Sequence, residues 1–220
     1  MIDQIRSRGL PRGVEVALAI FGLALTAPLC LLVTILIRLN SPGPVIFRQL
    51  RMGRDRKTFT LLKFRSMRVS NEGALVTAAG DNRISKIGRL IRRTKIDELP
   101  ELWNIIRGDM SIVGPRPEVP ELVDLGNPQW DEILTVNPGL TDPVTLQLRN
   151  EEDLLAQASD RDLFYKEIVQ PFKLRGYVHF VQNRTWKKDV SIIFRTIKAV
   201  IFPRSVTQPT IEEMRMSLAE

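Results

Sequence analysis

The stretch RRTKIDELPELWNIIRGDMSIVGPRPE, residues 92–118, places two adjacent carboxylates, Asp97 and Glu98, just ahead of Pro100 and a helix-like run that stops at Gly108. Proline is tolerated only in the first turn of a helix, where its missing N–H would have no partner anyway. Pro100 therefore predicts a helix start here, with Asp97 at or next to the N-cap and Glu98 in the first turn. Free backbone N–H groups and the positive end of the helix dipole favour the ionised form of both carboxylates.

Cations on either side of this pair change its interpretation. Taken alone, an Asp-Glu pair before a proline is most often a helix cap with a surface glutamate. Here Arg92, Arg93 and Lys95 precede the pair, and Arg116 follows it in the rigid turn Gly114-Pro115-Arg116-Pro117. Carboxylates surrounded by fixed cations indicate a site that works on phosphate groups.

The composition indicates a folded protein with a polyanionic partner. The 220 residues are 44% hydrophobic and 26% charged, which is enough for one domain with a buried core. The net charge of +7 and the pI of about 9.9 predict nucleic acid, lipid headgroups or a phosphorylated substrate as partner. Aromatic residues make up only 6% and form no stacking series, which disfavours single-stranded nucleic acid. With one cysteine, Cys30, and one histidine, His179, the chemistry falls to Asp, Glu, Lys and Arg.

Residues 14–37, VEVALAIFGLALTAPLCLLVTILI, form an apolar segment with one acid, Glu15. As a helix they would reach about 36 Å, which is enough to cross a bilayer. Pro28 in the middle removes a hydrogen bond and predicts a kink. Basic residues flank both ends, and because Lys and Arg near membrane segments stay cytoplasmic, they favour a helix that enters the membrane and turns back. A kinked spanning helix is the alternative.

The residues after the apolar segment predict a β-hairpin. Short strands at 45–47 and 58–62 flank a turn at 53–56. Lys63 and Arg65 then alternate with Phe64, so both cations point to one face, where they meet either solvent or phosphate.

Further helices follow from spacing and capping signals. Apolar residues recur at helical spacing over 84–91 and 186–201 with basic residues around them, which is typical of helices on a membrane surface and of helices packed on a core. Residues 150–169 predict a helix that Pro171 ends. The capping box of Thr210 with Glu213 predicts a last short helix.

These parts together indicate a reaction at phosphorus. Arg92 and Arg116 can make bidentate contacts with a pyrophosphate, and Lys63 can add a point charge. One carboxylate of the pair can attack phosphorus and form an acyl-phosphate. The other can carry Mg²⁺, which offsets the repulsion between carboxylates and phosphates.

Four segments resemble, in the same order, the bacterial sugar transferases, and in particular the small monotopic polyprenyl-phosphate phosphoglycosyl transferases. They are NSPGPVIFRQLRMGRD (40–55), LLKFRSM (61–67), the stretch 92–118 and NPGLT (137–141), and the resemblance covers about residues 14–201. It implies transfer of a sugar-1-phosphate from a UDP-sugar to undecaprenyl phosphate with release of UMP. It also implies a ping-pong reaction through a covalent phosphosugar on Asp97.

The resemblance assigns roles to single residues. It implies that Glu98 helps to bind Mg²⁺, and that a re-entrant membrane helix breaks at Pro28. The substrate- and phosphate-binding positions of the family fall on Lys63, Arg65, Arg92 and Arg116.

Two departures from the family pattern stand out. Some members have Ser directly before the break proline, whereas this chain has Ala27, with Thr26 one residue earlier as a candidate partner for the freed carbonyls. After Thr141 many members continue with Gly and a Q-x-x-G-R pattern, whereas this chain has Asp142-Pro143 and then QLRN. The second departure bears on sugar choice or on contacts between copies.

We therefore expect a helix-dominated α+β fold in three parts. These are a re-entrant N-terminal membrane helix (1–39), a compact catalytic domain at the cytoplasmic face with interfacial amphipathic helices and a small β-hairpin (40–203), and a tail with a short helix (204–220). The expected location is the bacterial inner membrane, and the expected role is to start glycoconjugate or exopolysaccharide biosynthesis.

The expected partners are a UDP-sugar, polyprenyl phosphate and membrane lipids, with Mg²⁺ as cofactor. A second copy of the chain is a candidate partner in a homodimer, and nucleic acid is not expected. The alternative function is a non-enzymatic anchor or adaptor that binds anionic lipids through its Arg and Lys faces.

Overall fold

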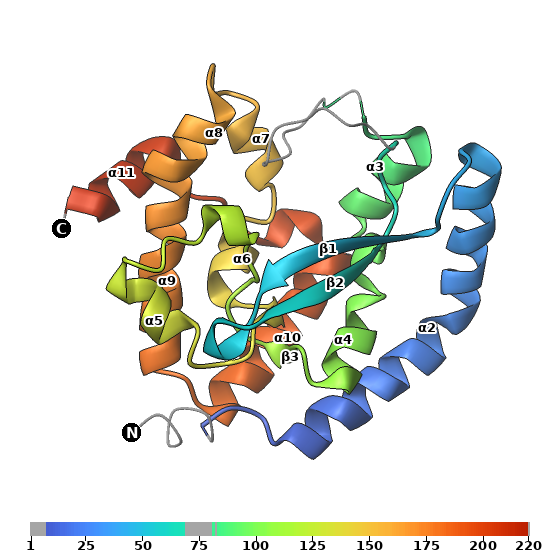
Figure 1. The fold of residues 1–220 in the computed structure, drawn as a ribbon, viewed down its shortest axis with the longest axis horizontal. Coiled ribbons are helices and arrows are strands. Elements are labelled where there is room, and N and C mark those ends of the chain that lie inside the picture. Colours follow the sequence, from blue (N-terminus) through green and yellow to red (C-terminus); the bar gives the residue numbers. More distant parts are fainter. Residues whose placement is uncertain (1–7, 69–80, 82, 220) are drawn as a thin grey trace.

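The structure is a computed structural model that describes residues 8–68, 81 and 83–219, and it confirms the helix-dominated α+β fold (Figure 1). The α-helices are α2 (Arg12–Asn40), α3 (Lys86–Arg93), α4 (Glu101–Arg107), α5 (Pro128–Ile133), α6 (Pro143–Gln147), α7 (Glu151–Leu155), α8 (Arg161–Phe164), α9 (Gln170–Gln182), α10 (Trp186–Ile201) and α11 (Ile211–Ala219). The strands are β1 (Ile46–Met52), β2 (Thr58–Phe64), β3 (Ser111–Val113) and β4 (Gly139–Thr141). Short 3₁₀ turns are η1 (Arg54–Arg56), η2 (Ile96–Glu98), η3 (Pro120–Leu122) and η5 (Pro203–Ser205), and η4 (Tyr165–Val169) is a π-helix.

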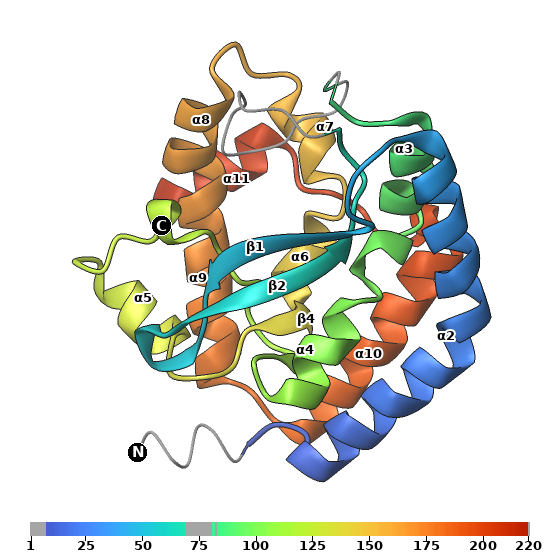
Figure 2. The same cartoon turned by 45° about the vertical axis from the view of Figure 1, so that its right-hand side comes forward.

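The apolar segment forms one helix, α2, which runs along an edge of the molecule and bends part-way (Figures 1 and 2). It is continuous through Pro28, so the proline bends the helix without interrupting it. Thr26 Oγ1 donates to the carbonyl of Gly22 at 2.7 Å and not to that of Ala24, which is the carbonyl that Pro28 cannot serve. A hydroxyl that bonds back one turn in this way also bends a helix. Over the described residues, α2 is the one helix whose length and hydropathy suffice to cross a membrane.

The N-terminal end of α2 is fixed to the domain by buried charge. Glu15, which is 3% exposed, accepts a hydrogen bond from the N–H of Ile112 in β3 at 3.1 Å. Just before the helix, the N–H of Leu10 donates to Asp189 of α10 at 3.0 Å. Asp189 is fully buried and pairs with Arg184 at 2.8 Å. The helix therefore begins against β3 and α10.

The C-terminal end of α2 is fixed to the same domain. The Arg65 guanidinium donates to the carbonyls of Ser41 and Pro42 at 2.8 and 2.7 Å. Next to this junction Val33 and Ile37 pack with residues of β2 and α3 in a small apolar cluster. Both ends of α2 are thus attached to one folded unit, with α4 packed along the helix between them.

The outward sides of α2 and α10 expose large apolar residues. On α2, Phe21 is 64% and Leu25 69% exposed, which is unlike the core helix of a soluble domain. In α10, Ile192 and Ala199 are buried in the core, whereas Phe194 and Ile201 are more than 60% exposed. The helix predicted at 186–201 therefore packs on the core with one side and presents an apolar surface with another.

The predicted hairpin is confirmed, and α4 is attached to its open edge. Strands β1 and β2 pair antiparallel from Ile46↔Phe64 to Met52↔Thr58. The fully buried Asn104 of α4 donates Nδ2 to the carbonyl of Thr60 at 2.8 Å and accepts from the N–H of Leu62 at 3.0 Å. This side chain completes the strand edge and brings the start of α4 beside the end of β2.

The prediction of one helix over 150–169 is wrong. The chain forms α7 and α8 separately, and then passes through the π-helix η4 into α9. Pro171 does not end a helix, because α8, η4 and α9 follow one another without a break and the π-helical turn η4 lies directly before the proline. The capping box is confirmed: Thr210 accepts from the N–H of Glu213 at 3.2 Å, and Glu213 accepts from the N–H of Thr210 at 2.7 Å.

Candidate active site

The turn that carries Asp97 and Glu98 is set by a residue in the left-handed region. Lys95, with φ 59°, ends α3 in the way that a C-terminal helix cap does, and redirects the chain into η2. The prediction that Asp97 caps α4 is wrong, because Pro100 occupies the cap position and no side chain makes a capping bond there. Asp97 is instead buried, with 6% of its surface exposed.

Glu98 lies at the centre of a cluster of ion pairs. Its Oε1 accepts from Arg116 Nη2 at 2.6 Å and lies 3.3 Å from Lys63 Nζ. Lys63 also pairs with Glu101 Oε1 at 3.1 Å. Glu101 is 1% exposed and was not predicted from the sequence, because it reaches the site only through Lys63 of β2. The expected grouping of Lys63 and Arg116 around the Asp-Glu pair is thus observed.

The two adjacent carboxyl groups differ in their acidity. Burial raises the pKa of Asp97, and the charge of Glu98 raises it further. Burial would also raise the pKa of Glu98, but Arg116, Lys63 and Lys95 outweigh it and hold that pKa well below its ordinary value. The expectation that the helix start favours ionisation of both groups is therefore wrong for Asp97. Neighbouring carboxyl groups whose pKa values are pushed apart have different chemical roles.

Several buried polar atoms around the pair have no hydrogen-bond partner. Within the part of the chain that the structure describes they include Asp97 Oδ1, Arg116 Nη1, Arg92 Nε and Arg149 Nη2. Arg92 acts electrostatically on Asp97, and Arg149 interacts with Glu98, so these atoms belong to one site. Buried N–H groups and carboxylate oxygens nearly always have partners. Unpaired atoms of both signs fit a ligand that brings anionic oxygens together with a cation.

Arg92 and Arg65 are placed differently from each other. Arg92 forms an ion pair with Glu152 of α7, and its Nη1 lies 3.4 Å from Ser66 Oγ. Arg65 is 6% exposed, and its guanidinium holds the junction after α2. Lys63 and Arg65 therefore reach different partners, and phosphate binding by Arg65 stays a prediction.

The donor set around Glu98 fits a magnesium ion. No group of three or more His, Cys, Asp or Glu side chains is arranged as a metal site within residues 8–68, 81 and 83–219. Mg²⁺ does not need such a group, because it is commonly held by one or two carboxylates together with substrate phosphates and water. Both ion pairs of Glu98 use Oε1, which leaves Oε2 for a cation, and Asp97 Oδ1 has no partner.

Arg149 is a further cation that the sequence did not single out. It lies in the QLRN segment that departs from the family pattern. Burial lowers its pKa and the charge of Glu98 raises it, so the charge of Arg149 interacts with that of Glu98. The preceding Asp142 is fully buried and accepts bonds from the N–H groups of Val144 and Thr145, so it caps α6.

Comparison with known proteins gives a consistent picture. The sequence model of the family described as "Bacterial sugar transferase" matches residues 6–203. The chain is 34% identical over 201 residues to a UDP-N-acetylgalactosamine-undecaprenyl-phosphate N-acetylgalactosaminephosphotransferase of Aeromonas hydrophila, covering 87% of this chain and 44% of that protein. It is 34% identical over 195 residues to a UDP-glucose:undecaprenyl-phosphate glucose-1-phosphate transferase of Caulobacter vibrioides, covering 86% and 69%.

A third relative is close to the chain in length. The exopolysaccharide production protein PSS of Rhizobium leguminosarum bv. phaseoli is 34% identical over 202 residues, which are 86% of this chain and 93% of that protein. The chain thus spans less than half of the Aeromonas relative but nearly all of the Rhizobium one.

Proposed function

The chain belongs to the bacterial sugar transferase family, and we propose that it moves a sugar-1-phosphate from a UDP-sugar to polyprenyl phosphate and releases UMP. The observation that carries this proposal is the Asp97-Glu98 pair, whose pKa values shift in opposite directions among buried cations with unpaired N–H groups. The names of the relatives, which include undecaprenyl-phosphate sugar phosphotransferases and an exopolysaccharide production protein, support the same reaction and a role at the start of glycan assembly.

In the first step, Asp97 attacks the phosphorus that carries the sugar. A bond forms between a carboxylate oxygen of Asp97 and that phosphorus, and the bond to the oxygen of UMP breaks, so that UMP leaves with the electron pair. Asp97 suits this role because its Oδ1 is buried without a partner. Its raised pKa makes it the more basic, and hence the more nucleophilic, carboxylate of the pair.

In the second step, an anionic oxygen of polyprenyl phosphate attacks the same phosphorus. The bond to Asp97 breaks, the carboxylate is restored and the sugar diphosphate lipid leaves. No proton has to move in either step, which agrees with a site that contains no histidine. The acyl-phosphate between the two steps makes the reaction ping-pong.

The cations of the site bind and neutralise phosphate oxygens during both steps. Arg116 has one unpaired buried Nη1, and Lys63 lies between two carboxylates, so both can exchange a protein partner for a phosphate oxygen. Glu98, which stays ionised, would hold Mg²⁺, and the bound ion would reduce the negative charge of the diphosphate.

We also infer that α2 enters the membrane and returns to the same side. Its two ends are attached to one folded domain, the first through Glu15 and Leu10 and the second through Arg65. A helix that spanned the bilayer would have to release one of these attachments. Basic residues at both flanks favour the cytoplasmic face of the bacterial inner membrane.

Labelling of single cysteines tests this topology. We expect cysteines at Arg8 and Asn40, placed in a Cys30→Ala background, to react with a membrane-impermeant reagent from the same side of inverted vesicles. Both positions are exposed in the structure, so that reactivity reports the side of the membrane. Labelling from opposite sides would show a spanning helix.

A UMP-release assay tests the reaction itself. We expect one member of a panel of UDP-sugars to give UMP in the presence of Mg²⁺, with continuous turnover only when polyprenyl phosphate is added. Without acceptor, release stops after about one equivalent, because the phosphosugar stays on the protein. If no UDP-sugar yields UMP, while the chain binds anionic vesicles in a salt-sensitive way, the anchor or adaptor alternative is correct.

A further inference from the structure

The turn that carries Arg116 is held by backbone bonds on two sides. On one side lies β4. The carbonyl of Thr141 accepts from the N–H of Gly114 at 3.0 Å, and the N–H of Gly139 donates to the carbonyl of Pro115 at 2.9 Å. From β1, the N–H of Met52 donates to the carbonyl of Glu118 at 2.8 Å. These bonds fix the path of the backbone through the turn. The electrostatic surroundings of Arg116 depend instead on the neighbouring side chains.

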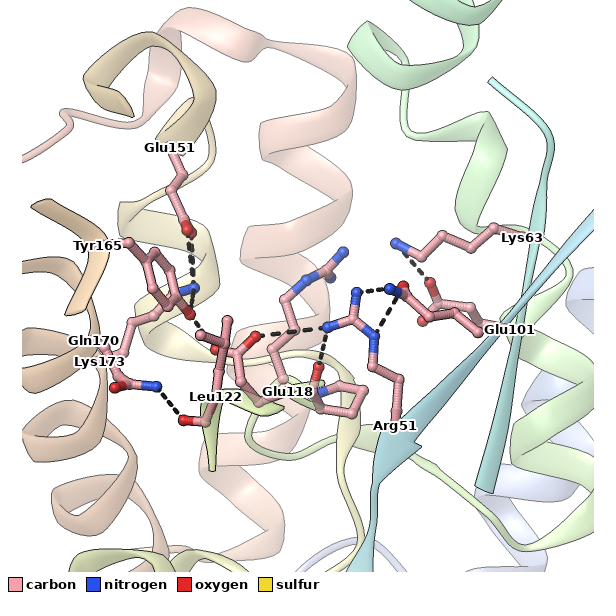
Figure 3. A network of polar contacts seen from close by, with 12 residues as sticks. Arg51, Lys63, Glu101, Glu118, Leu122, Glu151, Tyr165, Gln170 and Lys173 are labelled. Atoms are coloured by element: carbon pink, nitrogen blue, oxygen red, sulfur yellow. Dashed lines mark hydrogen bonds and ion pairs between the residues drawn. The ribbon is translucent and has the colours of Figure 1, made fainter. Parts of the chain in front are cut away.

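A row of polar side chains from η4, α9 and α7 reaches this turn. The Tyr165 hydroxyl donates to Glu118 Oε2, and Lys173 Nζ donates to that hydroxyl at 3.1 Å and to Glu151 Oε1 at 3.0 Å. Figure 3 shows Glu118 between Tyr165 and Arg51, with Lys63 and Glu101 beyond Arg51. Tyr165 of η4 is 1% exposed and Lys173 of α9 is 6% exposed, so this end of the row is buried.

Arg51 joins this row to the candidate active site. Its Nη1 donates to the carbonyl of Pro117 at 3.0 Å and lies 3.5 Å from Glu118 Oε1. Burial lowers the pKa of Arg51, the Glu118 carboxylate raises it, and the charge of Arg116 lowers it again. The charge of Arg116 thus acts on Arg51, and Glu118 is the anion that pairs with Arg51, whereas Glu98 and Glu101 act on Arg116 itself. The geometric link to Arg116 is the bond from Arg51 to the carbonyl of Pro117, the next residue in the turn.

The helix geometry supports a specific role for Tyr165. This residue begins the π-helix η4, a rare helix type that is often found at functional sites. The wider turn carries the chain from α8 into α9 and points the Tyr165 hydroxyl at Glu118. Over the same interface, Gln170 Nε2 donates to the carbonyl of Leu122 at 2.6 Å without touching Glu118.

We propose that Tyr165 and Lys173 position Arg116 through Glu118, so that Arg116 stays directed at Glu98 while its second nitrogen remains available to phosphate. The inference rests on the proposed function, because Arg116 matters only if the site binds a diphosphate. Tyr165, Lys173 and Glu118 are positioning residues, since none of them needs to touch substrate.

The Tyr165→Phe variant tests this proposal in a cycle with Arg116→Lys. With Arg116 present, loss of the hydroxyl is expected to lower the single-turnover rate of UMP release about tenfold, as small displacements of a charged group do. In the Arg116→Lys background the same change is expected to cost less than about twofold, because the group that it positions is already altered. If the rate of the Arg116→Lys variant falls below detection, the affinity for UDP with Mg²⁺, measured by calorimetry, replaces the rate as the quantity compared across the cycle.

Two controls separate positioning from simple loss of structure. Gln170→Leu removes a bond across the same interface and should leave the rate unchanged, with thermal unfolding recorded for every variant. The inference would be overturned if Tyr165→Phe lowered the rate equally in both backgrounds, or if it did not lower the rate when Arg116 is present. Failure of the parent chain to release UMP would instead count against the proposed function.

Discussion

Replacement of Asp97 by Asn is expected to lower turnover by roughly 10³-fold or more, because removal of a covalent nucleophile leaves only the binding and electrostatic parts of catalysis. The amide has nearly the same shape as the carboxylate but cannot attack phosphorus. Asp97 Oδ1 makes no hydrogen bond in the folded protein, so the substitution breaks no structural contact at that atom. The variant should therefore fold, bind UDP-sugar and fail at the first step.

Two measurements check this expectation. In the parent, incubation with UDP-sugar and Mg²⁺ without acceptor should add the mass of one phosphosugar to the peptide that contains Asp97. In Asp97→Asn that mass and the first equivalent of UMP should both be absent. Asp109→Asn is a matched control from the same stretch, since it weakens only a contact with Arg107 at 3.4 Å and one with Asn104 at 3.2 Å. A phosphosugar on Glu98, or normal turnover by Asp97→Asn, would contradict the assignment.

Most parts of the fold that follow from local sequence were predicted correctly, the exceptions being the helix over 150–169 and the capping role of Asp97. The hairpin follows from alternation around its turn, α4 from Pro100 and Gly108, and α11 from its capping box. Each of these depends on residues within a few positions of one another. Propensity, turn chemistry and capping act at that range.

Apart from the helix predicted over 150–169, the parts that were missed depend on contacts between distant segments. Glu101 becomes a site residue only because Lys63 lies beside it, 38 positions earlier in the chain, and the parallel pairing of β3 with β4 joins Ser111 to Gly139. The two carbonyl partners of the Arg65 guanidinium after α2 also follow from tertiary packing, and its assignment to phosphate by resemblance stays a prediction. Charge clusters can be recognised in a sequence, but their partners are decided by tertiary packing.

The acidity of Asp97 was also beyond sequence reasoning. The helix dipole and the free N–H groups argued for easy ionisation. In the folded protein burial and the charge of Glu98 prevail, because Asp97 is 6% exposed and makes no capping bond. An estimate from the dipole alone has the wrong sign wherever a carboxyl group is desolvated without hydrogen bonds.

The same charges predict that the two carboxylates affect stability in opposite directions. The folded-state pKa of Asp97 lies above its unfolded value, so its contribution is present below the unfolded pKa and is lost as pH rises through the folded pKa. Above the unfolded pKa, Asp97 therefore destabilises the fold, and Asp97→Asn should raise the unfolding temperature. The folded-state pKa of Glu98 is depressed, so Glu98 stabilises the protein above its unfolded pKa, and this contribution is lost as pH falls through the folded pKa.

Glu98→Gln is therefore expected to destabilise the protein by about 3–5 kcal/mol at neutral pH, since it leaves the Arg116 guanidinium without its charged partner in the interior. Thermal unfolding in detergent from pH 4 to pH 8 checks both signs. The gain from Asp97→Asn should grow as pH rises, and the loss from Glu98→Gln should shrink as pH falls, whereas Glu212→Gln on the exposed side of α11 should change little at any pH. If both substitutions shifted the unfolding temperature in the same direction, the two carboxylates would not be held in opposite states. The proposed difference in role, with Asp97 as the nucleophile and Glu98 as the cation ligand, would then have no physical basis.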